Sequence, residues 1–76
     1  MDNGLSANSI KYIISRILEN ANDARKEDSE NKGSEFYDGK SLAYYEVLNT
    51  IKNELEVREQ DLKEFGLDFN LEKSFL

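Results

Sequence analysis

Apolar residues recur every three or four positions in two stretches of the chain, the spacing that places them on one side of an α-helix. The first stretch carries the stripe Ile10, Ile14, Ile17, Ala21 and Ala24. Ser6 or Asn8 can cap its start, because a short polar side chain accepts hydrogen bonds from the free N–H groups of a first turn. The pattern predicts a helix over about 7–27.

A longer stripe follows a polar connection over about 28–34. Its members step alternately by four and three residues: Tyr37, Ser41, Tyr44, Leu48, Ile51, Leu55, Arg58, Leu62 and Phe65. Seven of these nine residues are apolar or aromatic, so the heptad pattern predicts a second helix over about 35–65. Gly39 lies inside this range, either as a packing glycine or because the helix begins only at Asp38. We favour a start near Glu35.

The second helix is expected to stop at Gly66, because glycine readily adopts the left-handed conformation that ends many helices. The tail over 67–76 is rich in large apolar residues, namely Leu67, Phe69, Leu71, Phe75 and Leu76. Such a tail is too apolar to remain free, so we expect it to dock. Asp68 or Asn70 is a suitable cap for a short helical turn within it.

These elements predict an all-α fold with one helical domain over 1–76. The fold is a two-helix antiparallel hairpin with a short C-terminal helical turn, since a short connection makes consecutive helices antiparallel neighbours. A hairpin of this size is marginally stable alone, and Tyr12, Leu18, Leu42 and Val57 add apolar surface off the stripes. We therefore predict a homodimer that completes a four-helix bundle.

The residues expected to form the core or dimer interface are Ile10, Ile14, Ile17, Tyr44, Leu48, Ile51, Leu55, Leu62 and Phe65. Arg58 interrupts the second stripe. We expect its guanidinium group to reach the edge of the bundle or to pair with an acidic residue.

The 76 residues include no Cys, His, Trp or Pro. The chain therefore lacks the commonest general base, the commonest transition-metal ligand and any thiol nucleophile. We expect no enzymatic activity and no cofactor. Two carboxylate pairs, Glu56–Glu59 and Glu54–Asp61, have helical spacing suited to a hard cation, but most of them lie off the apolar stripe.

Two further patterns are better explained by packing. Gly39-Lys40-Ser41 matches the end of a phosphate-binding P-loop, but Ser34 stands where that motif needs its first glycine. Tyr37, Tyr44 and Tyr45 form an aromatic group of the kind that stacks on bases, yet the surrounding charge is acidic.

The net charge of −6 is unevenly distributed. Residues 1–33 hold five basic and six acidic side chains, whereas 34–76 hold five and ten, with most of the excess between Glu54 and Glu72. Nucleic acids and anionic membranes are bound through basic patches, so we expect neither as a partner. The chain also lacks a signal-like start and a long apolar window, and we expect a cytoplasmic location.

The sequence thus favours a non-enzymatic, small oligomeric helical protein that acts as a protein–protein interaction or regulatory module with an acidic surface. Its expected partners are itself, as a dimer, and a protein docked on the acidic half. Two alternatives stay open: a carboxylate-based metal or small-ligand binding bundle, and a purely structural self-assembling protein.

Overall fold

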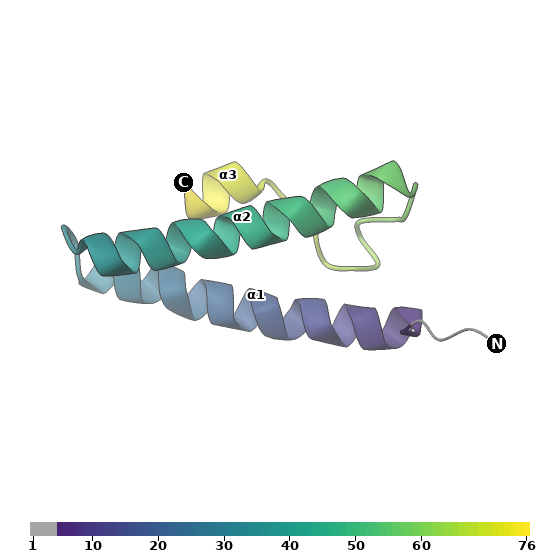
Figure 1. Ribbon diagram of the computed structural model, residues 1–76, viewed down its shortest axis with the longest axis horizontal. Coiled ribbons are helices and arrows are strands. Elements are labelled where there is room, and N and C mark those ends of the chain that lie inside the picture. The colour runs from purple at the N-terminus through teal and green to yellow at the C-terminus, as the bar shows by residue number, and fades with distance from the viewer. Residues whose placement is uncertain (1–4) are drawn as a thin grey trace.

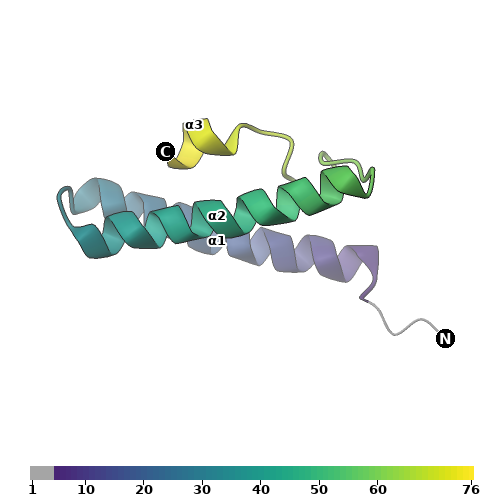
Figure 2. The same cartoon turned by 45° about the horizontal axis from the view of Figure 1, so that its top comes forward.

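The computed structural model describes residues 5–76, which form three helices and no strand (Figure 1). The helices are α1 (Ala7–Glu30), α2 (Glu35–Val57) and α3 (Leu71–Phe75). α1 and α2 lie side by side and antiparallel, and α3 packs against α2 (Figures 1 and 2). The predicted all-α hairpin with a short third helix is confirmed. The molecule is elongated, with principal extents of 49 × 20 × 15 Å.

Serine side chains cap both long helices. The Ser6 hydroxyl accepts a hydrogen bond from the Ser9 N–H at 3.1 Å, and the Ser34 hydroxyl accepts from the Tyr37 N–H at 3.5 Å. Each bond satisfies an N–H group that has no partner within the first turn. Both starts agree with the sequence, and no atom lies within 4 Å of a Cβ built on Gly39, so that glycine serves no close helix packing.

α1 extends three residues beyond its predicted end, so the connection is shorter than expected. The segment after Ala24 is entirely polar, but it contains neither glycine nor proline before Gly33 and can continue the helix. The Asn31 side chain donates to the Glu27 carbonyl at 2.8 Å, and Gly33 then reverses the chain with a φ of 89°.

α2 ends at Val57, and the predicted end at 65 was wrong. The chain leaves the helix through a Schellman motif centred on Glu59, whose φ is 57°. The Gln60 N–H donates to the Leu55 carbonyl at 2.9 Å, and the Glu59 N–H donates to the Glu56 carbonyl at 3.0 Å. With 24 and 23 residues, α1 and α2 have nearly equal lengths. A longer α2 would therefore project past the start of α1 and expose its apolar side chains.

The predicted stop at Gly66 closes a separate turn after α2. Gly66 has a φ of 74°, as expected of a left-handed glycine. Its N–H donates to the Lys63 carbonyl at 3.2 Å, and the Leu67 N–H donates to the Leu62 carbonyl at 3.0 Å. The same Schellman hydrogen-bond pattern therefore occurs twice within eight residues, first around Glu59 and then around Gly66.

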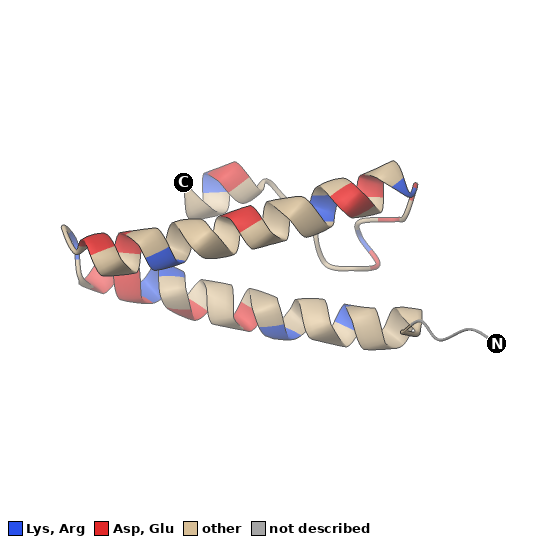
Figure 3. Cartoon of the chain, in the orientation of Figure 1, with Lys and Arg blue, Asp and Glu red and all other residues tan. Residues whose placement is uncertain are grey.

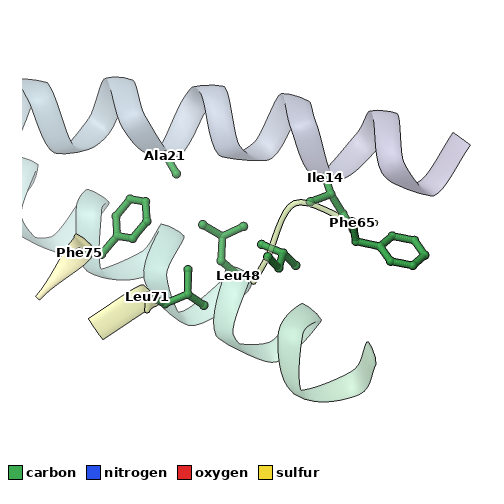
Figure 4. Packing of buried hydrophobic residues seen from close by; sticks show 7 residues of the cluster. Ile14, Ala21, Leu48, Phe65, Leu71 and Phe75 are labelled. Atoms are coloured by element: carbon green, nitrogen blue, oxygen red, sulfur yellow. The ribbon is translucent and has the colours of Figure 1, made fainter. Parts of the chain in front are cut away.

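The C-terminal segment, residues 61–76, folds back along the hairpin and completes the core. Asn70 caps α3 by accepting from the Lys73 N–H at 3.0 Å. The buried cluster joins both long helices to this segment and consists of Ile14, Ala21, Leu48, Phe65, Leu67, Leu71 and Phe75 (Figure 4). Four of its seven members belong to the C-terminal segment, which therefore supplies much of the apolar layer expected from a second copy.

Candidate functional site

The predicted core residues divide into two groups. Ile14, Leu48 and Phe65 are buried. The others are partly buried: Ile10, Ile17, Tyr44, Ile51, Leu55 and Leu62. The second group lies at the edge of the core and is partly exposed to solvent. Arg58 is exposed and pairs with Glu54, its Nη1 lying 2.6 Å from the carboxylate.

One side of α1 is covered by the C-terminal segment. Lys11 lies 5.7 Å from the centre of the Phe65 ring and 3.8 Å from the Glu64 carboxylate. Arg25 lies 5.8 Å from the centre of the Phe75 ring. A Cβ on Gly66 would meet the Leu18 side chain at 3.8 Å. The contacting residues of α1 are spaced by seven, so they mark one line along the helix.

α2 contacts the same segment through two polar side chains that are also seven residues apart. The Tyr45 hydroxyl donates to the Glu72 carboxylate at 3.1 Å, and the Lys52 ammonium donates to the Phe69 carbonyl at 2.7 Å. Desolvation and the bond to Glu72 raise the pKa of the Tyr45 hydroxyl. We call this side of the hairpin the covered face.

The opposite side of the hairpin, here called the open face, carries exposed apolar residues. Two positions along a helix correspond to a rotation of about 200°. Ile13 follows Lys11 by two and Val47 follows Tyr45 by two, so both point away from the C-terminal segment. Their exposed fractions are 44% and 47%. Sequence reasoning singled out neither residue, although their spacing from the covered positions is visible in the sequence.

The apolar residues noted off the stripes behave differently from one another. Tyr12, Leu42 and Val57 are exposed, with fractions of 62%, 45% and 74%. Leu18 packs on the core beside Gly66. Part of the surplus apolar surface is therefore used within the chain, and part of it remains accessible.

The acidic excess lies where α2 ends and the chain turns back. All the acidic residues between Glu54 and Glu72 are exposed. Three of these carboxylates have side-chain partners, since Glu54 pairs with Arg58, Glu64 with Lys11, and Glu72 with Tyr45. A fourth, Asp61, accepts from the Lys63 N–H at 3.1 Å. Figure 3 shows red and blue segments at both ends of α2 and a mainly uncharged middle.

The Gly39-Lys40-Ser41 motif is part of a packed helix. Gly39, Lys40 and Ser41 lie within α2, and no phosphate-binding loop is formed there. Lys40 donates to the Glu27 carboxylate at 3.0 Å, and this bond raises the pKa of the Lys40 ammonium. Ser41 is buried, so its hydroxyl is not presented to a substrate.

The surface depressions of the described chain are shallow and polar. One lies at the connection between α1 and α2 and is lined by Asp28, Lys32, Glu35 and Asp38. Among residues 5–76, no group of three or more His, Cys, Asp or Glu side chains is placed to hold a metal ion. The carboxylates paired by their spacing in the sequence are not brought into such a group.

Comparison of the chain with protein-family models, with curated proteins and with solved structures finds no match in any of the three. Within residues 5–76, no helix combines the length and apolar character needed to cross a membrane. The molecule's own surfaces are therefore the guide to its function.

Proposed function

We propose that this protein is a non-enzymatic interaction module that self-associates. The observation that supports the proposal is the open face, where Ile13 and Val47 are exposed although the chain has already closed its core with the C-terminal segment. Single exposed apolar residues are common on soluble proteins. Here they are joined by Phe36 and Val57, which are 70% and 74% exposed.

The acidic turn after α2 supports a second part of the proposal, a protein partner with a basic surface. Complementary charge speeds the encounter of two proteins and orients them. Nucleic acids and anionic membranes do not fit this role, because their phosphates would face the acidic half of the chain. The proposal includes a cytoplasmic location, with which the lack of cysteine is compatible.

Light scattering coupled to size exclusion tests the self-association directly. At micromolar concentration we expect a mass of about twice the chain mass of 8.8 kDa. Urea unfolding at several protein concentrations is the companion measurement, since the midpoint of a dimer rises with concentration. A monomer that unfolds cooperatively, with a midpoint independent of concentration, would contradict the proposal.

A further inference from the structure

We propose that two copies pair through one line of α2, antiparallel, about a two-fold axis that passes beside Val47. This inference rests on the self-association proposed above and adds the surface and its register. The surface is a second stripe on α2, distinct from the one that enters the core.

This outer stripe follows the spacing of four and three that makes a continuous helix seam. Its members are Phe36, Lys40, Ala43, Val47, Thr50, Glu54 and Val57. All are exposed except Lys40, which is half-buried. The C-terminal segment contacts α2 at Tyr45 and Lys52, on the other side of the helix. α1 reaches the outer stripe only at Lys40, through the Glu27 carboxylate, and the other six residues of the stripe are exposed.

The outer stripe is nearly symmetric about Val47. Lys40 and Glu54 lie seven residues before and after it, which is about 10 Å along the helix in each direction. In an antiparallel pair, Lys40 of one copy therefore faces Glu54 of the other. Phe36 faces Val57 in the same way. A parallel pair would instead place Lys40 against Lys40, so the charges favour the antiparallel arrangement.

The ion pairs within each chain extend this complementarity. Lys40 already binds Glu27 at 3.0 Å, and Glu54 already binds Arg58 at 2.6 Å. Antiparallel pairing joins them into a row of alternating charge, from Glu27 and Lys40 of one copy to Glu54 and Arg58 of the other. Two such rows flank Val47, where the two copies meet through small and apolar side chains.

The size of the open face sets an upper limit on the area that two copies can bury. A helix of 23 residues is about 35 Å long, and two helices side by side are about 20 Å wide. The whole open face therefore outlines about 700 Å², and because the outer stripe is only one line of it, each copy buries less than the roughly 800 Å² of a standard interface. Ile13 of α1 lies on the same side and widens the apolar contact.

A matched pair of substitutions tests the surface. Val47→Asp places like charges together at the axis, and we expect the dimer dissociation constant to rise about 100-fold or more. Leu42→Asp is the control, because Leu42 has nearly the same exposure (45% against 47%) but lies about 140° around the helix. Sedimentation equilibrium measures both constants, and circular dichroism checks that both variants remain helical.

Charge exchange tests the register. Lys40→Glu and Glu54→Lys should each weaken the dimer about tenfold, because each variant faces like charges across the axis. An equimolar mixture of the two variants should associate about as tightly as the unaltered protein, since the mixed dimer restores both opposite-charge contacts. In another register Lys40 does not face Glu54, so mixing the two variants would not restore the association that each has lost.

The possible failures are distinguishable. A monomeric unaltered protein would overturn both self-association and this interface. A dimer that tolerates Val47→Asp as well as Leu42→Asp would overturn only the interface. Loss of dimer in Val47→Asp without recovery in the charge-exchanged mixture would overturn the antiparallel register.

Discussion

Leu48 and Val47 are neighbours on α2, yet Leu48 is fully buried on the core and Val47 is 47% exposed on the open face. The hairpin thus has two apolar faces, and the C-terminal segment covers one of them. Folding alone explains the covered face, because Leu67, Leu71 and Phe75 bury it. No segment within residues 5–76 buries the open face in this way, and this difference is why we assign it to association.

The strongest test of the comparison removes the covering segment. Deleting residues 67–76 takes three buried apolar side chains out of the core, each worth about 1.5 to 3 kcal/mol when fully buried. We expect the free energy of unfolding to fall by several kcal/mol, enough to unfold so small a domain. Urea titration followed by circular dichroism measures the loss. An unchanged midpoint would show that the C-terminal segment adds nothing to the free energy of unfolding. The covered face would then be no more important to stability than the open face.

Two leucines of α2 give the same comparison at single-residue resolution. Leu48→Ala should lower the free energy of unfolding by about 3 kcal/mol, because the side chain is fully buried and leaves a cavity. Leu42→Ala is the matched control, since its side chain is 45% exposed and should lose less than about 1 kcal/mol. Equal losses in urea titrations would contradict the burial that separates the faces.

Two chain reversals, at Glu59 and Gly66, carry the C-terminal segment to the covered face. Glu59→Gly should raise stability by up to about 1 kcal/mol, since a left-handed backbone strains a residue with a Cβ. Gly66→Ala should lower it by about 1 kcal/mol for the same reason. A new Cβ there meets only ordinary contact with Leu18. Effects of the same sign in thermal unfolding would show that backbone conformation does not control these turns.

The smallest expected effect concerns pH. The folded protein raises the pKa of the Tyr45 hydroxyl, so it keeps this proton more tightly than the unfolded chain does. As the pH rises through the ordinary tyrosine value of about 10, the unfolded chain loses its proton first and stability falls. Tyr45→Phe should reduce this alkaline loss, measured by thermal unfolding between pH 8 and 11. The same slope in both proteins would exclude Tyr45 as its source.

The starts of both long helices were predictable because their signals are local. Ser6 and Ser34 precede apolar repeats and cap them in the structure, and the left-handed conformation of Gly66 also follows from its residue type. The end of α2 was not predictable in this way. Leu62 and Phe65 continue the apolar repeat whether or not the helix continues. Whether α2 ends at Val57 or extends to Phe65 depends on the length of α1, which lies beside it. Glu59 gives no sign of a left-handed turn, since glutamate rarely adopts one.

The candidate surface was only partly predictable. The sequence indicated surplus apolar residues but did not divide them between the chain's own core and a partner. That division depends on which line of each helix the C-terminal segment covers, which is a contact between distant parts of the chain. Phe36 and Val47 have the spacing of a seam with Lys40 and Glu54, but only the structure shows that Phe36 and Val47 are exposed.

The reversal at Glu59 has a consequence for the order of folding. α1 and α2 meet first near their short connection and can join progressively from there, at little cost in chain entropy. Docking the C-terminal segment brings Glu64 to Lys11, a contact that would close a loop of more than fifty residues unless the hairpin had already placed the start of α1 beside the end of α2. We therefore expect the hairpin to form early and the segment to dock late. In native-state hydrogen exchange, α3 would open before the middle of α2, exposing the core briefly without unfolding the hairpin.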